Sequence, residues 1–477
     1  MKRLFLALLI LLAPSSLLRA FPGVQCGAPD STGTLSGLQV HAADSTGAHS
    51  GLHSADSTGA FRVGPVSPEA EKAVRSTQGF RQGISIVPLP IISYNTDLGL
   101  QYGAYVDLFD YGTQPSLFPD FYHHLHVEGS HYTKGQTFIH SEYDSSFLIP
   151  GVRFTASLSW QRDPLFQFYG FNGSVTAYDS SIDRRDGIAY YSYKRSLLRF
   201  ISTFQGRIYG PLGWMAGLNF RYYKSENLDF KGYDPANTLF RNYLDNGIIK
   251  EDELGGMLAD LTAGLRFDTR DFEPDPMDGI WAELFLNGSP DFFRTGYPYL
   301  KVALRWRQYI TPGPEWLTLA YHIAWQSTVL GRAPFYIQQN LCTVQVRQAT
   351  TEGLGGINTL RGVMASRLIG DGYAWSNFEV RLRLLQWDFL KMSWTFAVNP
   401  FYDLGCITKP FRLEEMAAAY GRSAAELRRE TVRLHHSAGV GIKVGMNSNS
   451  IFSLEWAKPF NSQDGRSSIY FAINYVF

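Results

Sequence analysis

The sequence lacks three features that would each point to a class of protein. Its 477 residues carry 43 basic and 43 acidic side chains, so no charge excess suggests a nucleic-acid partner. Three cysteines, Cys26, Cys342 and Cys406, give neither a disulfide framework nor a metal-ligand spacing. After the N-terminus, no stretch approaches the ~20 apolar residues that a membrane-spanning helix needs. If the chain enters a membrane, it must do so as a β-barrel.

The first 20 residues are typical of a secretory signal peptide. Lys2 and Arg3 precede an apolar run from Leu4 to Leu12, and a small residue, Ala20, marks the expected cleavage site. A lipoprotein signal that ends at Cys26 is the alternative, but PGVQC lacks the usual residues before the cysteine. We therefore expect an exported chain.

Residues 21–80 are predicted to form a disordered linker. The tetrapeptide DSTG begins at Asp30, Asp44 and Asp56, and the segment is polar, rich in glycine and poor in aromatics. Such a composition cannot bury enough apolar area to fold.

From residue 81 to Phe477 apolar and polar residues alternate, as in strands with one apolar and one wet face. In NFEVRLRLL, for example, phenylalanine and aliphatic residues oppose Glu379, Arg381 and Arg383. The aromatic fraction of 15% and the 45 glycines also favour strands and turns. Sixteen strands are predicted, near 83–92, 98–110, 121–132, 135–147, 151–163, 190–209, 213–225, 257–270, 279–289, 297–311, 316–328, 376–386, 392–404, 434–445, 450–458 and 468–477.

Turn lengths favour a membrane barrel over a soluble β-sandwich, which would also alternate. Tight turns such as FLIPGV and ITPGPEW alternate along the chain with four long loops, at 163–190, 225–257, 330–375 and 405–434. Short turns at one end and long loops at the other are typical of an outer-membrane barrel. The predicted fold of residues 81–477 is all-β, a 16-stranded antiparallel transmembrane barrel.

One glycine-rich loop carries a single charge. GLGGINTLRGVMAS, residues 353–366, has only Arg361 as a charged residue, followed by Gly362. Here the chain resembles the BamA/TamA-type bacterial surface-antigen barrels, in which an Arg-Gly loop folds back into the lumen. The resemblance continues in SNFEVRLRLL at Glu379 and in FYDLGC at Asp403.

The alternation independently places Glu379 and Asp403 on the wet faces of their strands, hence in the lumen. A buried cation must be paired, and a guanidinium can bridge two carboxylates. We therefore predict that Arg361 enters the lumen and binds Glu379 and Asp403. The alternative is a solvated surface loop with an incidental arginine.

Two further motifs match the same family. LRFDTRDFEPDPMDGIWAELFL resembles its earlier hairpin, and SSIYFAINYVF resembles the C-terminal signal that the barrel-assembly machinery reads. The matched hairpin residues are Asp268, Arg270, Asp271, Pro276 and Gly279, and those of the assembly signal are Tyr475 and Phe477.

The chain departs from the family in two places. About 60 residues separate Ala20 from the first strand, fewer than one of the family's periplasmic domains needs, so we expect a member without them and a periplasmic linker instead. The stretch from Glu414 to Arg433 is rich in Ala, Glu, Arg and Leu, which predicts an outer loop helix. That helix is either a partner-binding or capping element or simply a solvated surface helix.

The first strand contains Pro88 and Pro90, two residues apart, so both missing N–H groups face the same edge. In a closed barrel this edge meets the last strand, and we expect a seam short of hydrogen bonds. A wide turn or a late start of the strand is the alternative explanation for the two prolines.

The functional hypothesis is a non-enzymatic outer-membrane assembly factor of a Gram-negative bacterium, needing no cofactor and contacting outer-membrane lipid and the barrel-assembly machinery. A passive channel and an accessory subunit of a larger complex, bound through helix 414–433, remain alternatives. An enzyme is less favoured because no G-x-S-x-G motif occurs. The best candidate for a metal site is a cluster on two neighbouring strands, which is more simply explained as polar lining of the lumen. Its members are His124, His126, Glu128, His140 and Glu142.

Overall fold

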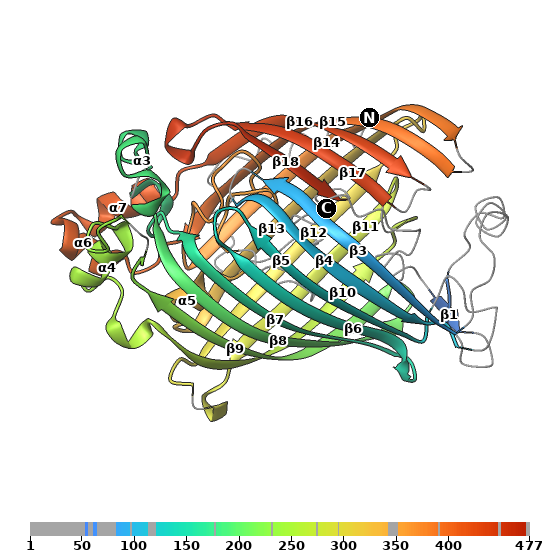
Figure 1. The fold of residues 1–477 in the computed structure, drawn as a ribbon, viewed down its shortest axis with the longest axis horizontal. Coiled ribbons are helices and arrows are strands. Elements are labelled where there is room, and N and C mark those ends of the chain that lie inside the picture. Colours follow the sequence, from blue (N-terminus) through green and yellow to red (C-terminus); the bar gives the residue numbers. More distant parts are fainter. Residues whose placement is uncertain are drawn as a thin grey trace.

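The computed structural model describes residues 53–55, 61–63, 83–95, 98–112, 121–175, 178–229, 232–272, 275–293, 295–341, 352–389, 392–446 and 450–473. Sixteen antiparallel strands form one closed barrel, in which each strand pairs with its neighbours in sequence and β18 returns to β3 (Figure 1). The strands of the barrel are β3 Ile84–Asn95, β4 Gly99–Asp110, β5 His123–Tyr132, β6 Thr137–Ile149, β7 Val152–Gln167, β8 Ser192–Tyr209, β9 Leu212–Glu226, β10 Gly255–Asp268, β11 Gly279–Ser289, β12 Tyr299–Ile310, β13 Leu317–Gly331, β14 Gly372–Phe389, β15 Met392–Lys409, β16 His435–Met446, β17 Ser450–Pro459 and β18 Ser468–Ile473.

The predicted fold is confirmed: the number of barrel strands and their order match the sequence pattern. The largest differences are strand extensions toward the loops, as in β14, which begins at Gly372, and β15, which continues to Lys409. Both additions lie at the end of the barrel that carries the long loops.

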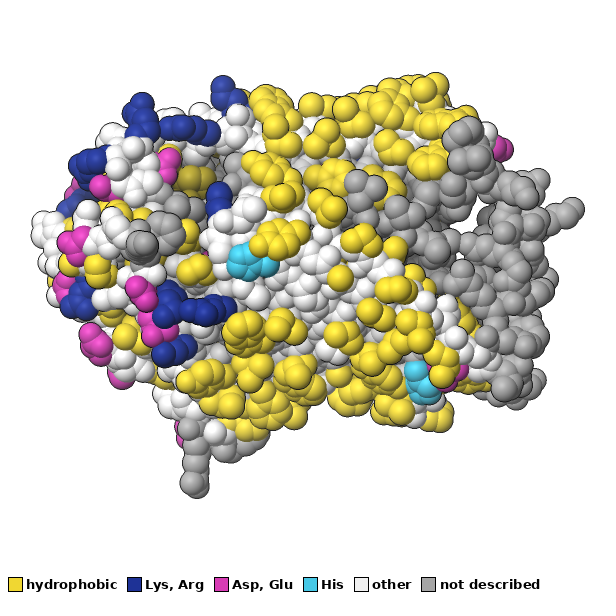
Figure 2. All heavy atoms as spheres, viewed as in Figure 1, with side chains coloured by type: hydrophobic (Ala, Val, Ile, Leu, Met, Phe, Trp, Pro, Cys, Tyr) yellow, Lys and Arg dark blue, Asp and Glu magenta, His cyan; other side chains and the backbone are white. Residues whose placement is uncertain are grey.

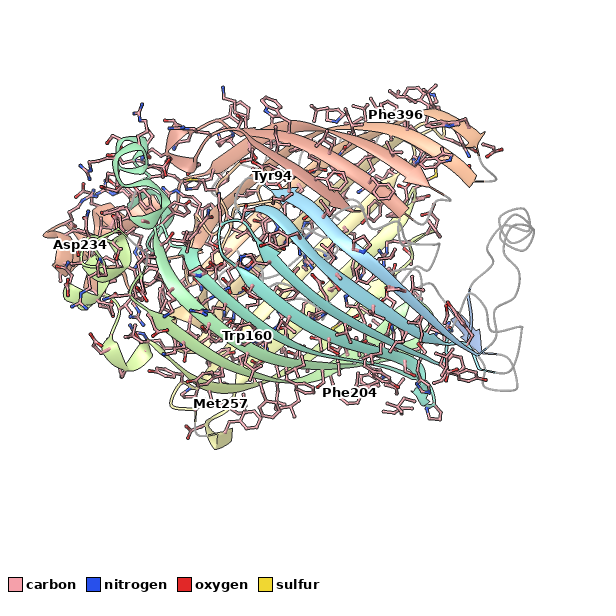
Figure 3. All side chains as sticks on the ribbon, viewed as in Figure 1. Tyr94, Trp160, Phe204, Asp234, Met257 and Phe396 are labelled. Carbon is pink, nitrogen blue, oxygen red and sulfur yellow. The ribbon has the colours of Figure 1, made fainter. Side chains whose placement is uncertain are left out.

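The outer surface of the wall is apolar because the outward residues of each strand are the apolar half of the alternation. Leu304 and Trp306 on β12, for example, are 45% and 41% exposed, while Arg305 and Arg307 between and beside them are buried. Figure 2 shows hydrophobic side chains over the wall and most charged ones at the end that carries the helices. Among the outward aromatics labelled in Figure 3, Trp160 lies nearer that end and Phe204 nearer the other.

All four predicted long loops lie at one end of the barrel, because successive antiparallel strands alternate direction. These loops, together with the shorter connections between β11 and β12 and between β17 and β18, are folded into a cap. Its helical segments are η5 Gly173–Val175, α3 Ser180–Asp186, η6 Gly187–Ala189, α4 Leu239–Asp245, η7 Glu251–Glu253, η8 Asp291–Phe293, α5 Phe335–Gln338, α6 Leu413–Tyr420, α7 Ala424–Thr431 and η9 Ser462–Asp464.

An aromatic cluster holds the cap together. Phe168, Phe171, Phe240 and Tyr243 are each 0% exposed and come from two different loops. The ring of Tyr243 packs edge-on against Phe168 and Phe171, at 5.2 Å between centroids in both cases. Its hydroxyl also accepts a hydrogen bond from the backbone N–H of Phe171, at 3.1 Å. Burial of these rings is what folds the loops against one another.

The predicted single helix over 414–433 is wrong in one respect: it is two helices, α6 and α7. Gly421 ends α6 in a left-handed conformation at φ 62°, which a glycine adopts without strain. Met416 and Leu427 bury the inner faces of the two helices in the cap, whereas Arg428 and Arg429 are exposed.

Part of the predicted linker lies outside the described residues, including all three DSTG repeats. Within it the structure describes a short antiparallel pair, β1 His53–Ala55 and β2 Phe61–Val63. None of the helices in the described ranges is long and apolar enough to cross a membrane.

We predict that Tyr243→Ala opens the cap without unfolding the barrel. Truncating a buried aromatic side chain costs about 3–5 kcal/mol, and here the loss falls on loops rather than on strand pairing. Limited proteolysis should cut within 227–254, while the shift in gel migration on heating, which reports the folded barrel, stays unchanged. Tyr222→Ala, which removes an outward-facing and 45% exposed ring from β9, serves as the control. Protection equal to that of the unmodified chain would contradict the assigned role of the cluster.

Candidate functional site

The centre of the site is the Arg361 side chain, which is 0% exposed inside the barrel. Its Nη1 lies 2.6 Å from Glu379 on β14, and its Nη2 lies 2.8 Å from Asp403 on β15. Nε donates a second bond to Asp403, at 2.8 Å, so this carboxylate is bound in the bidentate geometry that only arginine provides. The backbone N–H of Arg361 donates to Asp403 as well, at 3.0 Å. The structure thus brings together the three charged residues that the sequence singled out.

The ion-pair network extends beyond the three predicted residues. Glu455 on β17 lies 3.4 Å from Arg361 Nη1 and also binds Lys443 on β16, at 2.5 Å. On the other side, Glu379 accepts from Arg381 Nε at 3.0 Å. The network therefore holds three cations and three carboxylates. Of the three added residues, Arg381 is already on the wet face of its strand by the alternation. The same rule places Lys443 and Glu455 on the wet faces of theirs.

The Phe401 ring completes the surroundings of the guanidinium. The Cζ atom of Arg361 lies 3.5 Å from the centroid of this ring, within the range of a cation–π contact. Arg361 is thus enclosed by charged groups at its edge and by an aromatic face. A cation in such a setting is costly to remove because its partners lose their compensation.

Gly362 is required by the close approach of the loop to the wall. Its φ is 86°, and a Cβ there would lie 2.9 Å from backbone atoms of Ala457 and Lys458 on β17. The same residue donates its N–H to the hydroxyl of Tyr470 on β18, at 3.1 Å. A side chain at position 362 would push the loop away from β17 and break the hydrogen bond to Tyr470.

A second arginine, Arg367, directly follows residues 353–366 and fixes that end of the loop to the cap. Its guanidinium donates to the backbone carbonyls of Gln463 and Gly173, both at 3.0 Å, and lies 3.7 Å from Asp464. Asp464 is in turn 2.8 Å from His435 Nδ1. The loop is therefore anchored twice, at the lumen wall through Arg361 and at the cap through Arg367.

The barrel closes between β18 and β3, the last and the first of its strands. Tyr470↔Asn95 is the single register pair between β18 and β3 in the described ranges, whereas β3 is paired with β4 along its whole length. Residues 92–94 of β3 and 471–473 of β18 continue past this pair without pairing to each other. We call this junction, from Ile92 to Asn95 and from Tyr470 to Ile473, the seam.

Pro88 and Pro90 lie on the edge of β3 that faces away from β4. The N–H of Tyr111 donates to the carbonyl of Gly83, at 3.0 Å, so odd-numbered residues of β3 bond to β4 and even-numbered ones face the other edge. Both prolines are even-numbered, and neither has an N–H to donate. The edge below the seam therefore lacks two donors that a continuous ladder with another strand would use.

The histidine cluster faces the lumen on β5 and β6, as the alternation requires. His124 Nε2 and His126 Nδ1 both lie 2.8 Å from one oxygen of Asp107 on β4. His126 is 3.7 Å from Glu128, and His140 is 3.7 Å from Glu142. Across the described part of the chain, no group of three or more His, Cys, Asp or Glu side chains is arranged to hold a metal ion.

The matched hairpin residues form the turn between β10 and β11, at the end opposite the cap. Arg270 binds Asp268 through Nη2, at 2.7 Å, and its guanidinium stacks over Trp281 on β11, 4.0 Å from the ring centroid. Asp271 accepts from the backbone N–H groups of Phe272 and Met277, which shapes the turn around buried Pro276, and Gly279 has φ 111°. These residues build a turn and do not join the Arg361 network. Tyr475 and Phe477, the residues of the assembly signal, lie outside the described residues.

Comparison with known proteins agrees with this architecture. BamA from Haemophilus ducreyi, in a crystal structure lacking POTRA domains 1–3, is 15% identical over 82% of this chain and 70% of its own, with a TM-score of 0.54. CdiB from Escherichia coli is 9% identical over 87% of this chain and 64% of its own, with a TM-score of 0.51. At these identities the likeness shows the fold alone. No curated protein matches the chain in sequence.

The sequence itself settles the family. The family model described as the Omp85 superfamily domain matches residues 123–477, from the start of β5 to the last residue. This span holds the Arg361 loop, the carboxylates that bind it and the last strand of the seam. The chain belongs to the Omp85 superfamily of β-barrels.

Proposed function

We propose that this protein is a non-enzymatic barrel of the Gram-negative outer membrane that inserts or secretes other proteins, with the seam between β18 and β3 as its lateral opening. The observation that carries the proposal is the single register pair that the described residues form at the seam, next to an edge on which two prolines have no N–H to donate. BamA and CdiB, the structural relatives, support the general class.

The membrane location is supported by the wall itself. Outward Leu, Ile, Phe and Trp side chains on the strands would be exposed to water in a soluble protein, and such a surface is suited to lipid. Among the described residues, one register pair joins the two edges of the seam, so separating the edges there would break little hydrogen bonding. Elsewhere in the wall each strand is bonded along most of its length, so opening would cost more.

In this proposal the Arg361 loop holds the seam side of the barrel in register. The loop is bound to β14, β15 and β17 through ion pairs and to β18 through the bond from Gly362 to Tyr470. Tyr470 is also the β18 residue that pairs with β3. The loop therefore supports the half of the barrel that stays fixed while β3 moves away.

A passive channel is less supported. Nearly all residues from 352 to 370 are buried, so the loop occupies the lumen, and the aromatic cap covers one end. A solute would have to displace both, whereas lateral opening of the seam requires neither. The exposed side of α6 and α7 remains available for a partner subunit, which is the second role we propose for this barrel.

Replacing Arg361 tests the role of the loop. Arg361→Ala leaves Glu379, Asp403 and Glu455 facing one another, and breaking a buried pair on one side typically costs ~3–5 kcal/mol. The barrel should lose its heat-resistant gel migration at a lower temperature. Arg361→Lys should recover only part of the loss, because an ammonium cannot bind Asp403 in bidentate fashion. Arg428→Ala, on the exposed side of α7, should leave the transition in place. Equal stability of the alanine variant and the unmodified chain would exclude the proposed role of the Arg361 loop.

Cysteine labelling tests the topology. Ser423 is exposed between α6 and α7, and Gly313 is in a short turn at the opposite end with open space around it. In a background without native cysteines, a membrane-impermeant maleimide should label Ser423→Cys on intact cells. It should label Gly313→Cys only after the cells are lysed. The reverse labelling pattern would show that the cap end faces the periplasm, which would contradict the proposal.

A disulfide across the seam tests lateral opening. Continuing the register from Tyr470↔Asn95 by one residue places Tyr94 opposite Phe471, and both side chains face outward. Tyr94→Cys with Phe471→Cys should crosslink under oxidation, abolish the protein's cellular role and restore it on reduction. Ile442→Cys with Leu454→Cys, a register pair between β16 and β17, is the matched control that leaves the seam free. Full function of the crosslinked seam would show that the barrel works without opening there.

A further inference from the structure

An exposed cationic and aromatic patch covers the cap end of β16, β17 and β18. Its cations are Arg433, just before β16, Lys458 on the outward face of β17, and Arg466, just before β18. Its apolar members, Leu434, Phe460 and Ile469, are 53%, 61% and 48% exposed. We call these six residues the rim patch.

The three cations of the rim patch differ from several others at the same end of the barrel. Lys194 and Lys224, for example, share Glu226, and Arg332 binds Glu415. For Arg433, Lys458 and Arg466, no carboxylate lies within ion-pair distance in the described part of the chain. The nearest acid in the connecting loop, Asp464, is buried and bound to His435. Among the described residues, the patch therefore presents positive charge without an internal counterion.

The aromatic part of the patch is held rigidly in place. The rings of His436 and Phe460 stack at 4.6 Å between centroids and 11° between planes. The Tyr402 hydroxyl lies 2.9 Å from His436 Nδ1, which fixes the histidine ring, and the N–H of Phe460 donates to the His436 carbonyl at 3.0 Å. Phe460 thus offers an ordered apolar face beside Lys458, which is two residues earlier on the same side of β17.

The position of the patch relative to the apolar wall defines its environment. Going along the outward face of β17 toward the cap, Leu454 and Trp456 are followed by Lys458 and then Phe460. The change from aliphatic to aromatic and cationic residues is typical of the boundary between hydrocarbon and headgroups. At the cap end, which the proposed location turns outward, that boundary belongs to the outer leaflet.

We propose that the rim patch binds the headgroup of a phosphorylated glycolipid of the outer leaflet. Phosphate groups would bind Arg433, Lys458 and Arg466, since charge-assisted bonds from Arg and Lys to phosphate are among the strongest available at a surface. The carbohydrate ring would lie against Phe460, with Leu434 farther out toward the cap, and the acyl chains would lie against Ile469 and the wall below. Because β18 is the last strand before the seam, such a lipid would stand beside the outer end of the opening.

The test uses the purified full chain in detergent micelles, titrated with diphosphorylated lipid A and measured by native mass spectrometry. The triple variant Arg433→Gln, Lys458→Gln, Arg466→Gln should bind at least about tenfold more weakly, because each loses a phosphate contact. Lipid A without phosphates should bind weakly to both proteins. Phe460→Ala should weaken the binding of both forms of lipid A, with and without phosphates, by a similar factor.

A double variant, Lys194→Gln with Lys224→Gln, removes acid-paired cations from the same end of the barrel and should bind lipid A as the unmodified chain does. Retained gel migration on heating shows that each variant is folded, and Lys458→Arg in place of Lys458→Gln should restore part of the affinity that the triple variant loses. Equal affinity of the triple variant and the unmodified chain would overturn the proposal. The proposal would also be overturned if phosphatidylglycerol bound the unmodified chain as tightly as lipid A does, because the patch would then be a surface for anions in general.

This inference rests on the proposed membrane location but fails separately from it. If fractionation placed the protein outside the outer membrane, the location would be wrong while binding in micelles could still be measured. If the protein were in the outer membrane and the triple variant bound lipid A normally, only the rim patch would lose its role.

Discussion

The burial of one guanidinium organises this barrel. Arg361 cannot be 0% exposed unless carboxylates surround it, and those carboxylates must come from the wall, because the loop itself carries none near it. Glu379, Asp403 and Glu455 each supply charge from a different strand. The loop must then approach the wall closely, and this close approach requires a glycine at position 362. The far end of the loop must also be held, and Arg367 holds it at the cap. Cap, loop and wall are thus linked through the need to compensate a single cation.

Much of the fold could be predicted from the sequence because a barrel wall obeys one simple rule. Inward and outward residues alternate, so the alternation gives both the strands and the phase of each side chain. That phase alone places Glu379 and Asp403 in the lumen. The same rule applied to β16 and β17 would have found Lys443 and Glu455, but nothing in the sequence says which inward charges lie at the height that the loop reaches.

The parts that escaped prediction depend on contacts between distant loops. The division of residues 414–433 into α6 and α7 follows from Gly421, yet the break is fixed because both helices must bury Met416 and Leu427 in one cluster. The two arginines of the loop illustrate the same limit. Arg361 stands in a recognisable sequence motif. Arg367 instead binds backbone carbonyls of two other loops, and because every residue has a carbonyl, the sequence does not show which ones will bind an arginine.

The firmly anchored strand β18 lies beside β3 across the seam, and this arrangement is the physical argument that β3 is the strand that moves. The bond from Gly362 to Tyr470 ties β18 to the loop that Arg361 anchors in the lumen, while across the seam β3 has two prolines on the edge that faces away from β4. If the seam opens, β3 must move with β4, to which it is fully paired, and β18 must stay with the loop. A lipid headgroup at the rim patch would bind the stationary side, on β16 to β18. It would therefore mark the outer end of the opening without having to move when β3 does.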